Sequence, residues 1–237
     1  MNSDPAANEI PPVIVPSLPA DAGPMVIVEH LLKRPAHVLG RARQPRPGQL
    51  AAWLAVVIVL CVAVYGVVVG TFTGGQQIWA APVKIIVGTV SSALFCLPGL
   101  YMAACLSGRD VKVGEVAGDL LAAVALSSLL LLGFAPAAWL FSVSTRSIVF
   151  IGALHLFLWF VGTIAGLRLL NLALGNGRSI FRGHLLLWCL MFVLVSLQMT
   201  TTLRPLLGSS GQFLTPEKKF FVEHWWDCTQ RDSATAR

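Results

Sequence analysis

The chain has 237 residues, of which 56% are hydrophobic and 12% are charged, and its mean hydropathy is +0.75. Soluble domains carry about 25% charged residues, so this composition excludes a chain whose whole surface faces water. The formal net charge is +6, but the basic residues stand beside apolar runs and are not interleaved with aromatic residues. This placement argues against nucleic acid as a partner and favours the lipid bilayer with its anionic headgroups.

The first segment, residues 1–24, is rich in proline and lacks the basic start and apolar stretch of a signal peptide. Its prolines are Pro5, Pro11, Pro12, Pro16, Pro19 and Pro24. Because proline fixes φ and removes a backbone donor, this density predicts a disordered, extended tail on the cytoplasmic side of the membrane.

Residues 25–48 form a basic juxtamembrane segment. Its apolar residues near helical spacing are Val28, Leu31, Leu32, Val38 and Leu39, and its basic residues include Lys33, Arg34, Arg41 and Arg43. Pro35 interrupts the pattern. The segment therefore predicts a short, broken amphipathic helix lying on the membrane surface. A solvated basic linker is the alternative, because the apolar face is narrow.

Five long apolar runs follow between residues 49 and 207. The predicted spans are Leu50–Phe72, Val83–Leu106, Glu115–Phe141, Ser147–Leu174 and His184–Leu203. Each reaches the roughly 20 residues that a helix needs to cross the hydrocarbon core, where lipid offers no partner for unpaired backbone groups. The connections are short, which predicts antiparallel neighbours in one bundle. We therefore expect an all-α, polytopic membrane helix bundle with five transmembrane helices.

The distribution of Lys and Arg predicts the orientation of this bundle. Basic residues before the first span and in the second and fourth connections outnumber those on the opposite side by about two to one, which places the first set in the cytoplasm. With five spans, the N-terminus is then cytoplasmic and the C-terminus is outside. We expect the protein in a bacterial inner membrane.

Polar residues gather near the outer ends of the predicted spans. His155 in the fourth span lies at a depth similar to that of Gln198 in the fifth, and Thr201 and Arg204 follow. Pro136 in the third span leaves a carbonyl without its helical donor. Together they predict either a ligand, ion or lipid-headgroup site or, as we favour, hydrogen bonds between helices worth about 0.6 kcal/mol each.

Two acidic residues mark the inner edge of the third span. Glu115 and Asp119 are spaced i, i+4, so both carboxylates share one helix face. They predict either an acid–base or cation site or, as we favour, an acidic helix start near Arg109, Lys112 or Arg168.

Small residues and prolines predict the packing of the spans. Gly66 and Gly70 in the first span and Gly162 and Gly166 in the fourth form GxxxG patterns, which let helices approach closely. The Pro98-Gly99 pair predicts a kink in the second span.

The last segment, residues 208–237, carries an aromatic stripe among charged residues. Thr215 followed by proline and glutamate is typical of a helix start. The stripe consists of Phe220, Phe221, Trp225 and Trp226. We expect a short amphipathic helix on the outer membrane surface, or alternatively a patch that binds a partner protein.

Patterns for catalysis and metal binding are missing from the sequence. There is no HExxH, GxSxG or P-loop, and the five cysteines form no CxxC pair. We therefore expect a non-enzymatic protein that needs no cofactor and no metal.

A cytoplasmic proline-rich tail, a short amphipathic segment and five closely linked spans resemble the layout of the Yip family of membrane proteins. The resemblance covers residues from about 25 to 207, and the family's Asp-Leu-Tyr-Gly-Pro stretch is not found. In eukaryotes the family is tied to Rab-type GTPases and membrane traffic.

These features favour a scaffold, accessory subunit or organiser of a membrane complex, with other membrane proteins or a second copy as partners. The alternative is a small transporter or channel component whose outer-leaflet polar site includes His155, Gln198 and Arg204. A lipid-modifying enzyme ranks last, because no nucleophile and base are paired.

Overall fold

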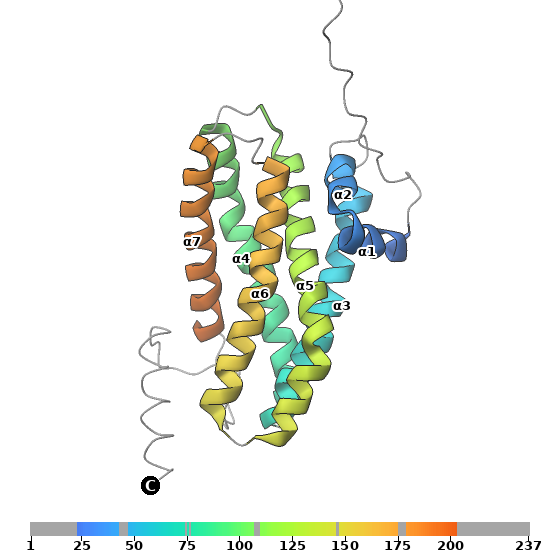
Figure 1. Cartoon of the computed structure of the whole chain (residues 1–237), viewed down its shortest axis with the longest axis vertical. Helices are drawn as coiled ribbons and strands as arrows, with labels where there is room; N and C mark the ends of the chain where they lie inside the picture. Colours follow the sequence, from blue (N-terminus) through green and yellow to red (C-terminus); the bar gives the residue numbers. More distant parts are fainter. Residues whose placement is uncertain are drawn as a thin grey trace, which may run out of the picture.

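The computed structural model describes residues 23–42, 47–73, 75, 77–106, 110–145, 147–174 and 179–202, and every regular element within these ranges is an α-helix (Figure 1). The helices are α1 (Pro24–Lys33), α2 (Pro35–Ala42), α3 (Pro47–Thr73), α4 (Gln77–Leu106), α5 (Val113–Ser144), α6 (Ile148–Leu174) and α7 (Ser179–Thr202). The all-helical prediction is thus confirmed for this part of the chain. Residues 1–22 of the predicted N-terminal tail (1–24) and the whole predicted C-terminal tail (208–237) lie outside it, whereas Pro24 is the first residue of α1.

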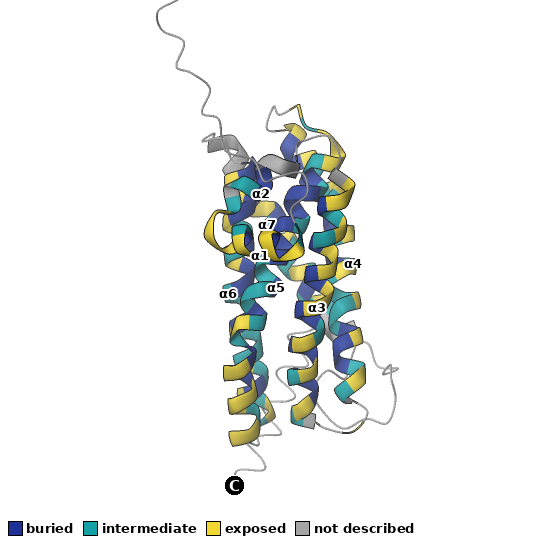
Figure 2. Ribbon diagram, turned by 90° about the vertical axis from the view of Figure 1, so that its right-hand side faces the viewer, coloured by how far each residue is buried: buried dark blue, intermediate teal, exposed yellow. Residues whose placement is uncertain are grey.

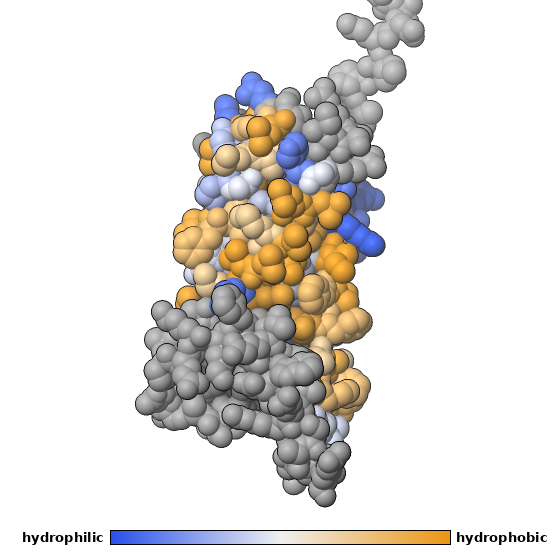
Figure 3. Space-filling model, turned by 90° about the vertical axis from the view of Figure 1, so that its left-hand side faces the viewer, coloured by the Kyte–Doolittle hydropathy of each residue, from blue (hydrophilic) through white to orange (hydrophobic). Residues whose placement is uncertain are grey.

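Within the described residues, four helices are long and apolar enough to cross a membrane, which makes the chain an integral membrane protein. The candidate spans are Gly48–Phe72, Ile78–Leu106, Val113–Ser144 and Ile148–Leu174, and α7 adds a shorter apolar stretch, Gly183–Met199. At 1.5 Å per residue the 32 residues of α5 extend roughly 48 Å, more than a hydrocarbon core of ~30 Å. Figure 3 shows the side on which α7 lies, where a band of hydrophobic side chains stands below hydrophilic ones.

The long helices run up and down in a curved row rather than a closed ring. Helix α3 packs against α4 on one side and α5 on the other, α6 packs on α5, and α7 packs on α4 (Figure 1). Helices α6 and α7 stand at the two ends of this row and contact each other only sparsely. Below, the α1 end denotes the end of the bundle where α3 and α5 begin, and the far end denotes the opposite one.

Glycines let neighbouring helices approach closely in this row. A Cβ on Gly66 of α3 would lie 2.5 Å from Cα of Pro82 in α4. A Cβ on Gly166 of α6 would lie 2.6 Å from the carbonyl oxygen of Ala123 in α5. The two GxxxG patterns therefore serve packing within the chain, as a small-residue contact allows.

Helix α4 begins at Gln77, earlier than the predicted start at Val83. Pro82 had been assigned to the connection before this span. The helix nevertheless continues through Pro82, which fits against Gly66 of α3. Membrane helices tolerate such prolines because neighbouring helices offset the lost bond.

Two apolar cores occupy the two ends of the bundle. The larger core, toward the α1 end, includes Leu54 of α3, Leu100 of α4, Leu120 of α5 and Leu170 of α6. The smaller core lies toward the far end around Tyr65 of α3. Figure 2 shows these buried residues between the helices, with exposed residues on the outer faces.

Helices α1 and α2 lie against the α1 end of the bundle, with Arg34 between them. The residue before a proline is disfavoured in a helix, which explains why α1 ends before Pro35. Ile27 and Leu31 of α1 are each 1% exposed and belong to the larger core, together with residues of α2. Part of the apolar face that the sequence analysis assigned to the membrane surface is therefore covered by the protein itself.

Candidate functional site

One side-chain hydrogen bond between two membrane helices joins Tyr65 of α3 to His155 of α6. The Tyr65 hydroxyl and His155 Nδ1 are 2.8 Å apart, and the two rings meet edge to face with centroids 5.5 Å apart. Tyr65 is only 5% exposed. The surrounding residues are apolar and include Leu131 and Leu158. The pair is thus a hydrogen bond held inside the smaller core.

The second ring nitrogen of His155, Nε2, can form a further hydrogen bond. Nε2 is buried and has no hydrogen-bond partner among the described residues. If Tyr65 donates to Nδ1, Nε2 carries the proton and is a buried donor; if Nδ1 donates to Tyr65, Nε2 is a buried acceptor. An unsatisfied buried group of this kind costs about 1–3 kcal/mol.

Of the predicted outer polar layer, the structure describes the side chains of His155, Gln198 and Pro136. His155 pairs with Tyr65, whereas the side chain of Gln198 in α7 is exposed. Pro136 is exposed within α5. The Thr201 side chain and Arg204 lie outside the described part of the chain.

Two residues that the sequence analysis did not select stand at the same level as His155. Tyr65 precedes the end of α3 at Thr73 by eight residues, and His155 follows the start of α6 at Ile148 by seven. Lys84 follows the start of α4 by seven residues and is 1% exposed. Residues at equal depth in antiparallel helices can be matched from the sequence alone. The predicted start of the second span at Val83, however, placed Lys84 at the edge of that span and not inside it.

The two acidic residues near the start of α5 occupy different surroundings. Glu115 is partly exposed in the first helical turn, where its charge complements the helix dipole. Asp119 is 1% exposed and therefore lies inside the bundle. They share a helix face but do not form one open acid–base site.

Serine hydroxyls in α5 are used by their own helix. Ser127, Ser128, Ser142 and Ser144 each donate to the carbonyl four residues earlier, over 2.7–3.0 Å. Such back-bonding satisfies the hydroxyl locally. Within the described ranges, no group of three or more His, Cys, Asp or Glu side chains is placed to hold a metal ion.

Helix α7 is attached to α4 through Trp188, which the sequence analysis also missed. Its Nε1 donates to the Cys96 carbonyl over 2.7 Å, and its indole lies beside Gly99, the second residue of the predicted kink. Trp188 is 4% exposed and stacks on Phe192 with ring centroids 5.4 Å apart. Gly99 therefore makes room for the indole that holds α7.

The predicted aromatic patch, Phe220, Phe221, Trp225 and Trp226, lies outside the described residues. Comparison of the chain with protein-family models, with curated proteins and with solved structures finds no match. The resemblance to the Yip family stays a prediction from layout.

Proposed function

We propose that this protein is a non-enzymatic, five-span membrane scaffold that binds another membrane protein or a second copy of itself along α6 and α7, which contact each other only sparsely. The observation that carries the proposal is the one-sided attachment of α7, which packs on α4 and meets α6 only sparsely. In a closed bundle a helix at this position has two neighbours. An open side can accept a helix from another chain.

The exposed face of α7 supports this assignment. Leu187, Leu190 and Leu194 are 67%, 57% and 57% exposed, while Trp188 between them faces α4. Apolar exposure alone does not identify a partner site, because lipid tails are as apolar as leucine. The proposal therefore rests on the sparse contact between α6 and α7, and the exposed leucines of α7 supply an apolar surface for a partner helix.

Five spans with the N-terminus in the cytoplasm suit the same proposal. The 24 residues of α7 extend roughly 36 Å, enough to cross a hydrocarbon core of ~30 Å. Helix α7 also packs beside the candidate span α4 along the bundle. The Lys and Arg distribution supports a cytoplasmic α1 end and an outer C-terminus, and a bacterial inner membrane is the location that we propose.

Photocrosslinking in native membranes tests the scaffold. A photoreactive amino acid at position 187 should give a discrete adduct of higher mass, either a dimer or a heterocomplex. Position 60 in α3 is a matched control, since Leu60 is also apolar and 61% exposed but lies on another helix. Adducts of equal yield at both positions, or lipid adducts alone, contradict the proposal.

A small transporter is the second candidate, favoured specifically by the buried Nε2 of His155. A permeating proton or polar molecule needs such a group along its path. Vesicles holding the purified protein and a pH-sensitive dye would report proton flux under a potassium diffusion potential. Proton flux that is lost in His155→Leu and kept in His184→Leu supports transport. Proton flux no greater than in empty vesicles rules out the transporter function.

A further inference from the structure

Helix α1 has an apolar edge that the bundle leaves uncovered. Ile27 and Leu31 face the bundle and are each 1% exposed, whereas Met25 is 78% exposed and Leu32 is 53% exposed. At 100° per residue, these exposed residues lie roughly a third of a turn around the helix from the buried ones. Figure 2 shows the exposed residues along α1 where it crosses the outside of the bundle.

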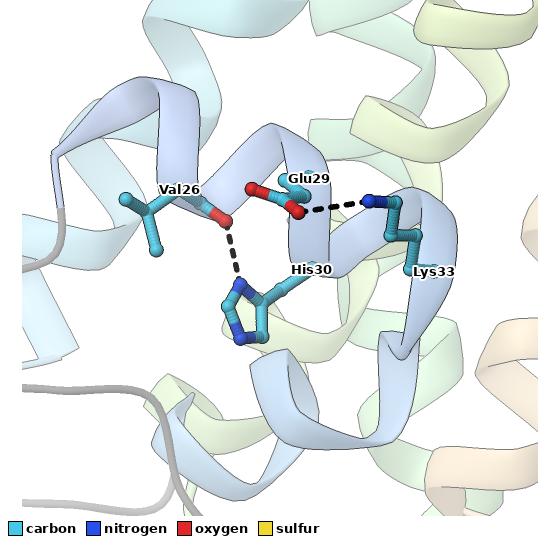
Figure 4. Close-up of polar contacts among 4 residues, drawn as sticks. All are labelled: Val26, Glu29, His30 and Lys33. Atoms are coloured by element: carbon cyan, nitrogen blue, oxygen red, sulfur yellow. Dashed lines mark hydrogen bonds and ion pairs between the residues drawn. The ribbon is translucent and has the colours of Figure 1, made fainter.

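The polar edge of α1 carries one ion pair, and the charge of Arg34 beside it is an additional positive charge. Lys33 Nζ and Glu29 Oε1 are 2.9 Å apart, and His30 Nδ1 and the Val26 carbonyl are 2.9 Å apart (Figure 4). The Lys33 ammonium lowers the pKa of Glu29 and so holds that carboxylate in its charged form. Arg34, exposed in the break after α1, has its charge available for an anion.

The excess of basic residues in the segment 25–48 also favours an anionic partner. Glu29 is its sole acidic residue between positions 25 and 48, and it stands against Lys33, Arg34, Arg41, Arg43 and Arg46. A basic surface beside an apolar edge is complementary to anionic lipid, which offers phosphate groups above acyl chains.

The position of α1 along the bundle matches the headgroup region. Helix α1 lies crosswise beside α3 (Figure 1) and shares a core with Leu54, seven residues or about 10 Å into α3. Helix α5, roughly 48 Å long, exceeds a ~30 Å hydrocarbon core by about 9 Å at each end. Interfacial helices bury their apolar faces about 5–10 Å into the boundary between headgroups and acyl chains. Helix α1 is therefore level with that boundary.

We propose that α1 binds an anionic lipid leaflet, with Met25 and Leu32 inserted at the acyl boundary and Arg34 on headgroup phosphates. Because Ile27 and Leu31 on the same helix pack into the bundle core, lipid binding at one edge stabilises the docking of the other. The α1–α2 segment thereby links the lipid composition of the leaflet to the α1 end of the bundle.

Fluorescence quenching tests the depth of the uncovered edge in the full-length protein. A cysteine-free variant carries one labelled cysteine, Leu32→Cys or Glu29→Cys, in vesicles of phosphatidylcholine and phosphatidylglycerol. The label at position 32 should be quenched more by shallow nitroxide lipids and less by iodide than the label at position 29. Iodide quenching that is equal at the two positions overturns the proposal, as does protection of position 32 from both quenchers, which would indicate a protein occupant.

Lipid retention tests the charge with variants of opposite sign. Native mass spectrometry would give the ratio of bound phosphatidylglycerol to bound phosphatidylcholine after extraction from mixed vesicles. Arg34→Gln should lower this ratio about fivefold, whereas Glu29→Gln should raise it, because Lys33 is released from its ion pair. Gln49→Asn, at an exposed neutral position, should leave the ratio unchanged.

A general loss of folding would lower the retention of both lipids and would not give opposite effects on their ratio. Ratios that stay unchanged in Arg34→Gln and Glu29→Gln, or that move in the same direction, overturn the assignment of anionic lipid. Both outcomes are independent of the α7 crosslinking result, so the lipid site and the scaffold can fail separately.

Discussion

Replacing a glycine by alanine should destabilise the bundle most where the new Cβ would lie closest to a neighbouring helix. A Cβ at position 166 overlaps Ser127 Oγ and lies 2.6 Å from the Ala123 carbonyl oxygen, which belongs to the backbone of α5 and cannot rotate away. A Cβ at position 162 lies 3.1 Å from the Ser127 carbonyl oxygen, which a small shift relieves. A Cβ at position 133 meets nothing within 4 Å.

The expected magnitudes follow from the balance of overpacking and helix propensity. Overpacking costs about 1–3 kcal/mol, and alanine is favoured over glycine in a helix by about 1 kcal/mol. We expect a net loss of about 2 kcal/mol for Gly166→Ala, a smaller loss for Gly162→Ala, and no loss for Gly133→Ala. For a chain of this size, 2 kcal/mol lowers Tm by roughly 4–8 °C.

Thermal denaturation in one mild detergent, followed by tryptophan fluorescence, checks this order. Gly133→Ala is the matched control, since it makes the same chemical change at an exposed position of α5. If Gly166→Ala melted together with Gly133→Ala, α5 and α6 would not be in the described contact, and the packing of the row would need to be redrawn.

Three further predictions concern single contacts and the topology. Tyr65→Phe removes the bond to His155 and should lower the unfolding free energy in detergent titration by about 0.6–1.7 kcal/mol; no change would mean that the pair does not form. Trp188→Phe keeps an aromatic ring but loses the donor to the Cys96 carbonyl, so it should cost about 1 kcal/mol by the same titration, and Trp188→Ala more. In intact cells, a membrane-impermeant thiol reagent should label Cys228 when the four other cysteines are replaced; labelling only after permeabilisation would contradict the outer placement of the C-terminus.

The helices were predictable because their apolar runs are long and nearly uninterrupted. A run such as the first span leaves the backbone no option in lipid other than a helix, so its position is readable without any partner. The same uniformity hides which face of a span packs on which neighbour. Tyr65 and Trp188 stand in apolar runs as ordinary aromatic residues, and only the arrangement of α3, α4, α6 and α7 shows that their polar atoms bond across helices.

Two differences between the predictions and the structure have physical causes of the same kind. Pro82 was assigned to the connection before the second span, yet α4 begins at Gln77 and its Pro82 fits against Gly66 of α3, so that Lys84 lies inside the bundle. Leu31 and Val38 were read as a membrane-facing stripe, yet they pack on other helices of the chain. The sequence of an apolar helix face indicates that the face is shielded from water, but it does not indicate whether lipid or protein shields it.

The positions of the buried charges favour a scaffold over a conduction path. Among the described residues, the buried charged side chains are Lys84, seven residues from the start of α4 at the far end, and Asp119, six residues from the start of α5 at the α1 end. At 1.5 Å per residue both lie about 10 Å inside their helices, which leaves roughly 28 Å of a 48 Å bundle between them. Between those levels the buried polar side chains of the described residues are four hydroxyls, those of Ser92, Ser128, Thr163 and Ser196, and Ser128 bonds to its own helix. A permeating ion would have to cross this distance with few groups to replace its water, whereas a scaffold needs only the packed core and the open side of α7.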